Sequence, residues 1–213
     1  QKVISFPCPF YSRLANVGQG DNRAQKRRKA RMTLSMTPDD VLALLKEGNR
    51  RFLSDEPITV QASRMSRLRM AAAQHPIAAY LSCSDSRVAP ELLFGRGLGE
   101  LFIVRNAGNS LCSTAIGSLE FAVTALGVPL IVVMGHENCG AVRAAVSVVK
   151  EHYGFSANIN KVLQPLYPAI MEVGEDCQHD LVNTAARHNV QRVVRELQEE
   201  ASPALRRPQE LGT

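Results

Sequence analysis

Three short hydrophobic runs constrain the fold of this chain more than any other feature. Residues 77–82, 101–104 and 129–134 are rich in Val, Ile, Leu and Ala, and segments with helical spacing separate them. Strands that are apolar along their whole length are typical of a parallel sheet covered by helices on both faces. We therefore expect an α/β fold with a central, mostly parallel β-sheet flanked by helices.

The helices are predicted from capping residues and from apolar residues at helical spacing. Thr37 precedes Pro38 and two acids, so a cap residue, a proline at the first helical position and negative charge at the positive end of the helix dipole come together. This start predicts a helix over 38–53, which forms an N-terminal helical arm with a second helix over 62–74. Further helices are expected over 113–126, 140–150, 159–173 and 180–200.

Basic residues are concentrated ahead of the first predicted helix. The chain has 25 Lys and Arg, 20 Asp and Glu and a formal net charge of +5, but residues 1–31 hold eight of the basic residues and one of the acids. The remainder, with 17 basic and 19 acidic residues, is slightly acidic. We therefore divide the chain into a basic flexible arm, residues 1–36, and one folded domain, residues 37–213.

Several interpretations of this arm stay open. It can contact nucleic acid or an anionic membrane, it can be the remnant of a targeting peptide, or it can be a tail with no specific partner. The compartment is cytoplasmic by default, and an organelle is the alternative if the arm is a targeting remnant. No apolar run approaches the roughly 20 residues that a membrane-spanning helix needs.

Two short polar segments follow two of the predicted strands. One begins with Cys83 and ends with Arg87 (CSDSR), and the other contains His136 and Cys139 (HENCG). Because the carboxyl ends of parallel strands open on the same edge of a sheet, the two sulfurs and the imidazole should converge. Zn²⁺ accepts such a Cys2His set and keeps a fourth position for water, whose pKa falls to roughly 7.

Asp85 and Arg87 accompany the predicted zinc ligands. Asp85 can complete the zinc coordination itself, which gives a closed site, or it can pair with Arg87 and accept a hydrogen bond from the zinc-bound water, which gives an open one. A bidentate guanidinium would fix the carboxylate and keep it ionised. Taken singly, each of these residues also has an ordinary structural interpretation as core or loop residue. Cys8, Cys112 and Cys177 have no ligand-like neighbours.

With these motifs the sequence resembles the β-class carbonic anhydrases. The likeness covers about residues 38–200 and includes GLGELFIVRNAGN at 97–109, AIGSLEFAV at 115–123 and PLIVVMGH at 129–136. The resemblance implies a zinc enzyme in which zinc-bound hydroxide converts CO2 and water to bicarbonate and a proton, reversibly. It also implies a homodimer or a tetramer of dimers, zinc ligation by Cys83, His136 and Cys139, and catalytic roles for Asp85 and Arg87.

The resemblance further implies three substrate-binding residues. Gln74 stands nine residues before the first zinc cysteine, where plant-like members have a Gln that reaches the substrate across the dimer interface. Phe102 and Phe121 match residues that line the CO2 pocket, and core packing is the alternative for both. Tyr80 stands where bicarbonate-regulated members have Trp, which favours the open site. The strand that the family forms after the last helix has no counterpart in residues 201–213.

Three other functions remain as alternatives. The same fold can hydrolyse CS2 or COS, or the chain can be a zinc-binding regulatory protein with an inactive site that docks through its basic arm. Nucleic-acid binding through residues 13–31 rests on charge alone and is not favoured.

Overall fold

A four-stranded sheet forms the centre of the protein. The computed structural model describes residues 12–16, 36–57, 62–173, 180–199 and 205. The strands are β1 (Ser12–Asn16), β2 (Ala78–Cys83), β3 (Leu101–Asn106) and β4 (Leu130–Met134), in the order β1-β4-β2-β3. Strand β2 pairs in parallel with both β3 and β4, whereas β1 pairs antiparallel with β4. The predicted α/β fold with a mostly parallel sheet is therefore confirmed.

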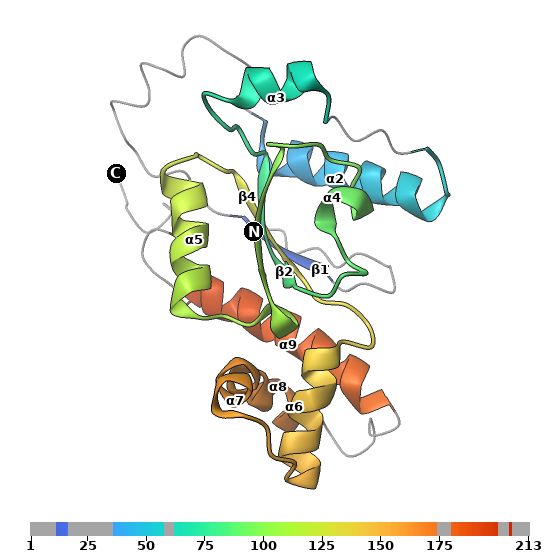
Figure 1. Cartoon of the computed structure of the whole chain (residues 1–213), viewed down its shortest axis with the longest axis vertical. Helices are drawn as coiled ribbons and strands as arrows, with labels where there is room; N and C mark the ends of the chain where they lie inside the picture. Colours follow the sequence, from blue (N-terminus) through green and yellow to red (C-terminus); the bar gives the residue numbers. More distant parts are fainter. Residues whose placement is uncertain (1–11, 17–35, 58–61, 174–179, 200–204, 206–213) are drawn as a thin grey trace.

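Helices cover both faces of the sheet because alternate residues of its buried strands point to opposite sides. Ala79 and Leu81 pack with helix α5 (Ser113–Thr124) and helix α9 (Leu181–Glu199). Tyr80 lies on the other face, in a cluster that includes helix α2 (Pro38–Leu53) and helix α4 (Pro90–Leu93). Figure 1 shows α5 on one side of the strands and α2 and α4 on the other.

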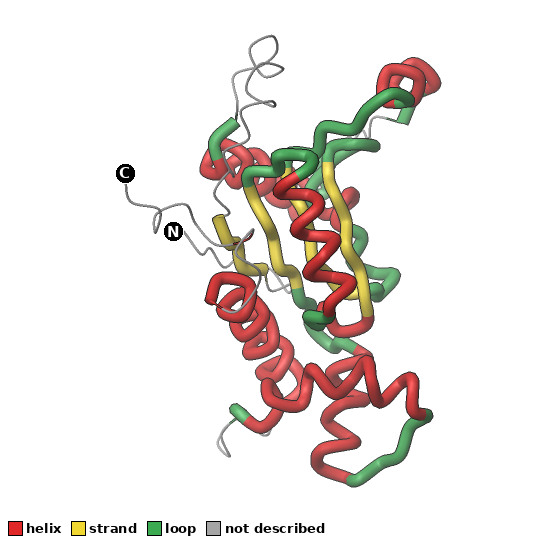
Figure 2. The backbone as a smooth tube through the Cα atoms, turned by 90° about the vertical axis from the view of Figure 1, so that its left-hand side faces the viewer, coloured by secondary structure: helices red, strands yellow, loops and turns green. Residues whose placement is uncertain are grey.

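The remaining helices lie at the two ends of the sheet. The views in Figures 1 and 2 place α6 (Gly140–Glu151), α7 (Ala157–Leu163) and α8 (Tyr167–Met171) beyond the carboxyl ends of the parallel strands. Helix α3 (Arg64–Met70) lies at the opposite end. Two 3-10 turns, Ala107–Asn109 and Gln164–Leu166, complete the described secondary structure. In the part of the chain that the structure describes, no helix is both long and apolar enough to cross a membrane.

A capping box accounts for the start of α2. Thr37 caps α2 and accepts a hydrogen bond from the Asp40 backbone at 3.2 Å, while the Asp40 carboxylate accepts one from the Thr37 backbone at 2.9 Å. The helix predicted over 159–173 is instead divided into α7, a 3-10 turn and α8. Pro165 and Pro168 lie at this division. Proline lacks the N–H that a continuous helix needs, so the helix is interrupted there. The helix predicted over 62–74 is confined to Arg64–Met70.

Strand β1 was not predicted, because Ser12–Asn16 lies inside the segment 1–36 that we expected to be a flexible arm. The short segment SRLAN carries no strand signal of its own. Its pairing uses the edge of β4, where unpaired backbone groups can take another strand. The other residues of the arm before Met36, and nearly all of residues 201–213, lie outside the described residues.

Helix α2 packs closely against α4 at Gly48. A Cβ atom at position 48 would overlap the carbonyl oxygen of Phe94, the residue that follows α4. Beside it, the buried Asn49 donates its side-chain N–H to the carbonyl oxygen of Leu93 at 3.2 Å. Helix α2 thereby contacts main-chain carbonyl groups of Leu93 and Phe94, at the end of α4.

We predict that Gly48→Ala destabilises the protein by about 1–3 kcal/mol, because the added methyl forces α2 away from α4. Gly154→Ala is the matched control, since Gly154 is exposed in the loop after α6 and a Cβ there has no neighbour within 4 Å. This control should be neutral or slightly stabilising, because Ala has less backbone freedom to lose on folding than Gly. Thermal unfolding of the two variants measures the difference, and equal midpoints would contradict the close contact.

Candidate metal centre

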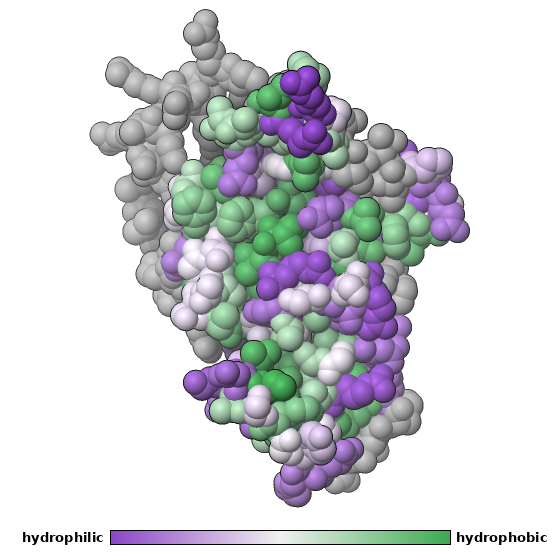
Figure 3. All heavy atoms as spheres, viewed as in Figure 1, coloured by the Kyte–Doolittle hydropathy of each residue, from purple (hydrophilic) through white to green (hydrophobic). Residues whose placement is uncertain are grey.

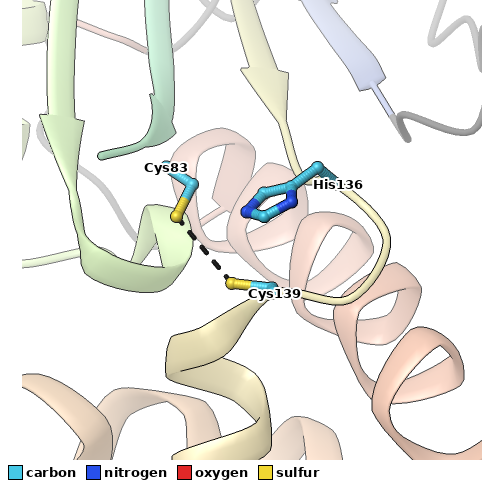
Figure 4. Close-up of side chains that lie close together, drawn as sticks. All are labelled: Cys83, His136 and Cys139. Carbon is cyan, nitrogen blue, oxygen red and sulfur yellow. Dashed lines mark hydrogen bonds between the residues drawn. The ribbon is translucent and has the colours of Figure 1, made fainter. Parts of the chain in front are cut away.

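Two cysteines and a histidine meet where two neighbouring parallel strands end. Cys83 is the last residue of β2, His136 lies in the loop after β4, and Cys139 is the residue immediately before α6. Figure 4 shows the three side chains directed toward one another from these separate segments. The predicted convergence at one sheet edge is confirmed for these residues.

The two sulfurs have the spacing of a tetrahedral zinc site, and the imidazole lies close to both. The sulfurs of Cys83 and Cys139 are 3.8 Å apart, and the possible ligand atoms of all three residues lie within 4.8 Å of one another. Two thiolates about 2.3 Å from a tetrahedral zinc ion would lie about 3.8 Å apart. All three residues are buried, with exposed fractions of 4% for Cys83 and 1% for each of the other two. These residues therefore fit a zinc ion.

His136 has one ring nitrogen available for a metal. Its Nδ1 lies 2.9 Å from the carbonyl oxygen of Glu137, and because a carbonyl only accepts, Nδ1 carries the proton and donates. This tautomer leaves a lone pair on Nε2, which is buried and has no hydrogen-bond partner. A buried acceptor without a partner is costly, and metal-binding histidines typically have their other nitrogen bound in this way.

The two thiols share a proton. A hydrogen bond from the Cys139 thiol stabilises the Cys83 thiolate and lowers the pKa of Cys83 to about 4. The same hydrogen bond, with burial, raises the pKa of Cys139. The Gly108 N–H, 3.4 Å from the Cys83 sulfur, also favours the thiolate. Gly108 has a φ of +78°, and a Cβ there would come within 2.8 Å of the Leu166 side chain, so glycine is required.

Asp85 and Arg87 form a close ion pair beside these ligands. Arg87 donates from Nε at 2.9 Å and from Nη2 at 2.7 Å to the two carboxylate oxygens, and its backbone N–H donates at 3.0 Å. These hydrogen bonds hold the pKa of Asp85 well below its usual range. Oδ2 of Asp85 lies 3.8 Å from Nε2 of His136. The carboxylate is therefore ionised, held by Arg87 and adjacent to the metal ligands.

The three predicted substrate-binding residues do not lie beside the metal ligands of their own chain. Phe102 and Phe121 contact each other with ring centroids 6.3 Å apart. Phe102 precedes Asn106, the partner of Cys83 in the sheet, by four residues, or about 13 Å of strand. Gln74 is exposed in the segment before β2, at the opposite end of that strand from Cys83.

Several supporting residues were not singled out from the sequence. Asn183 accepts a hydrogen bond from the Asn138 backbone at 2.8 Å, and the buried Asn189 donates to the Gly108 carbonyl at 2.9 Å. Arg105 donates to the carbonyl oxygens of Cys83 and Asp85. Arg105 and Gly108 stand in the quoted segment 97–109, but only the folded arrangement reveals what their side chains and backbone contact.

A family model and related sequences indicate the same family. A family model described as carbonic anhydrase matches residues 78–211, more than half of the chain. Carbonic anhydrase 2 of Mycobacterium tuberculosis strain H37Rv is 43% identical over 127 residues, which are 60% of this chain and 61% of that protein. A carbonic anhydrase of Mycolicibacterium smegmatis is 39% identical over 154 residues, 72% of this chain and 74% of that protein.

Solved structures agree in fold. A β-carbonic anhydrase of Coccomyxa in complex with acetazolamide has a TM-score of 0.54 at 23% identity, covering 77% of this chain and 73% of that one. A β-carbonic anhydrase of Sordaria macrospora, described as tetrameric, has a TM-score of 0.51 at 21% identity, covering 65% of this chain and 71% of that one. These similarities show a shared fold.

We predict that zinc uptake by the metal-free protein releases at least one proton per ion at pH 8. The ion needs both thiolates, and the raised pKa of Cys139 keeps its proton in place until the metal displaces it. The apparent affinity for zinc should therefore rise as the pH rises toward that pKa. Calorimetric titration in buffers of different ionisation enthalpy counts the protons, and a release of none would contradict the shared proton.

Proposed function

We propose that this chain, which belongs to the β-class carbonic anhydrase family, is a zinc enzyme that interconverts CO2 and bicarbonate. The observation that carries the proposal is the buried trio of Cys83, His136 and Cys139, whose possible ligand atoms lie within 4.8 Å of one another. His136 Nε2, one of these ligand atoms, is a buried acceptor without a hydrogen-bond partner. The same trio occurs within a chain region that matches the carbonic anhydrase family model.

Cys83, His136 and Cys139 would hold the zinc ion and leave one coordination position for a water molecule. A zinc ion in such a site lowers the pKa of that water to roughly 7 and so supplies a nucleophile at neutral pH. The His136–Glu137 hydrogen bond fixes the ring so that Nε2 would be available to bind the ion. Burial of all three ligands reduces competition from bulk water.

Asp85 would orient the nucleophile. Arg87 occupies both carboxylate oxygens and keeps the group ionised, so Asp85 can accept a hydrogen bond but has no proton to donate. An acceptor in this place fixes the O–H of the reacting water and turns a lone pair toward the CO2 carbon. The proton released in the reaction then passes to bulk buffer.

The substrate-binding residues would come from a second copy of the chain. Phe102 and Phe121 provide an apolar pair, and Phe121 is 51% exposed in the single chain. In Figure 3, hydrophobic side chains gather on the middle of the face where Figure 1 shows β3 and α5. Among the described strands, β3 is also an edge of the sheet, and backbone groups at an edge can pair with another strand. We therefore propose a homodimer or a tetramer of dimers in which Gln74, Phe102 and Phe121 complete the partner's site.

We predict that Cys83→Ser abolishes stoichiometric zinc binding, since the serine hydroxyl is a poor ligand at neutral pH, and abolishes CO2 hydration with it. Asp85→Asn should keep one zinc per chain and lose about 10²-fold or more in turnover, because the amide has no charge and orients the water poorly. Metal analysis and stopped-flow CO2 hydration measure both. Unimpaired turnover of Asp85→Asn, or hydrolysis of CS2 or COS in place of CO2 hydration, would contradict the proposal.

A mixed dimer tests whether the partner completes the site. The Cys83→Ser chain keeps Gln74 but cannot bind the metal. The Gln74→Ala chain keeps the metal ligands but lacks the side-chain amide of Gln74. A dimer of one chain of each, isolated with two different affinity tags, should have one complete site and about half of the wild-type activity. If Gln74 served its own chain, the mixed dimer would be no more active than its parents.

A further inference from the structure

Arg105 connects the end of strand β3 to the segment that carries a metal ligand. Its Nε donates to the carbonyl oxygen of Cys83 at 2.8 Å, and its Nη2 donates to the carbonyl oxygen of Asp85 at 2.6 Å. The two carbonyls stand on either side of Ser84, so a single planar guanidinium spans the first turn after β2. Hydrogen bonds from a charged donor are shorter and stronger than neutral ones.

The contacts of Arg105 fix the main chain of Asp85 relative to that of Cys83. The Ser84 N–H donates to the Asn106 carbonyl at 3.0 Å, which continues the β2–β3 ladder by one residue. The Val88 N–H donates to the Asp85 carbonyl at 3.2 Å, from the opposite side of the turn. Arg105 is the described side chain that holds the carbonyls of both residues, and it does so from the neighbouring strand.

The Asp85 carboxylate lies close to a position in which it could bind the metal ion. On a tetrahedral zinc ion, a carboxylate oxygen and an imidazole nitrogen lie about 3.3 Å apart. Oδ2 of Asp85 is 3.8 Å from Nε2 of His136, so the carboxylate lies near the place that a fourth ligand would take. A divalent cation attracts the carboxylate toward that position, and Arg87 attracts it away.

We infer that Arg105 is a positioning residue that keeps Asp85 off the metal. Arg87 holds the carboxylate itself, and Arg105 holds the main chain that carries it, so with Arg105 in place the main chain of Asp85 resists following the carboxylate toward the ion. Without Arg105, the Val88 N–H is the remaining described donor to the Asp85 carbonyl, and the turn can follow the carboxylate. The inference rests on the proposed function in one respect, which is that Cys83, His136 and Cys139 bind a metal ion.

Arg96 provides a matched control. It is also partly buried and also donates to two main-chain carbonyls, those of Phe94 at 3.3 Å and Leu44 at 3.4 Å. It belongs to the α2–α4 contact and not to the metal loops. Removal of its side chain therefore costs two main-chain hydrogen bonds and the ion pair with Glu100 at 3.6 Å, without releasing Asp85.

The test uses the full chain loaded with Co²⁺, whose visible spectrum reports an anion that enters the fourth coordination position. Azide is titrated into the wild type, Arg105→Gln, Arg96→Gln and Arg105→Gln/Asp85→Asn at one pH. In Arg105→Gln, Asp85 should compete for that position and raise the azide concentration at half-maximal change by roughly tenfold or more. The Arg96→Gln control should titrate like the wild type, and the double variant should return to within about twofold of it, because the amide is a weak ligand.

The possible outcomes distinguish the proposed metal site from the proposed role of Arg105. A wild type that binds no stoichiometric cobalt overturns the metal site itself. With cobalt bound, wild-type azide titration of Arg105→Gln overturns the role of Arg105. Loss of cobalt from a folded Arg105→Gln also overturns it, because Arg105 would then retain the metal and not position Asp85. If Arg105→Gln does not fold, Arg105→Lys keeps the charge without the fork, and the inference predicts weakened azide binding there too.

Discussion

The register between β2 and β4 is the constraint on which the site depends. The parallel ladder pairs Ser82 with Met134, so the residues that follow on each strand leave the sheet at the same edge. A slip of one residue would turn every side chain of a strand to the opposite face. Both strands are buried along their whole length, with apolar side chains on both faces. Such a slip would therefore also disrupt the two hydrophobic clusters, and the core thereby holds the metal ligands in place.

Helix α9 connects the core to the metal centre. Its buried stripe includes Val190, Val193 and Val194, which pack beneath β2 and β4, and Asn189 lies within the same stripe. Asn189 is 1% exposed and donates to the carbonyl of Gly108, whose N–H faces the Cys83 sulfur. About one and two-thirds turns earlier, Asn183 accepts a hydrogen bond from the backbone of Asn138, in the loop that carries His136 and Cys139. Helix α9 thus contacts both that loop and the 3-10 turn whose N–H faces the Cys83 sulfur.

Much of this arrangement could be predicted from the sequence because it depends on local patterns. Continuous apolar runs predict buried parallel strands, and parallel strands bring Cys83 and His136 to one edge whatever the detailed packing. Strand β1 could not be predicted, because its pairing depends on a free edge of β4 and not on a pattern within Ser12–Asn16. The division between α7 and α8 could have been predicted, because Pro165 and Pro168 stand in that part of the sequence and proline interrupts a helix. Arg105 could not be assigned, because its partners are carbonyl oxygens on another strand.

Two arginines hold Asp85 in different ways. Each uses two nitrogens of its guanidinium, one arginine on the carboxylate and the other on main-chain carbonyls. Arg87 binds the carboxylate through two nitrogens, which fixes the plane of the group as well as its charge. Arg105 binds two carbonyls that a single ammonium could not reach in the same geometry. Because Asp85 has a pKa well below its usual range, its protonation does not change near neutral pH. In the proposed zinc site, the position of this carboxylate, and not its charge, would therefore decide whether the fourth coordination place is open to water.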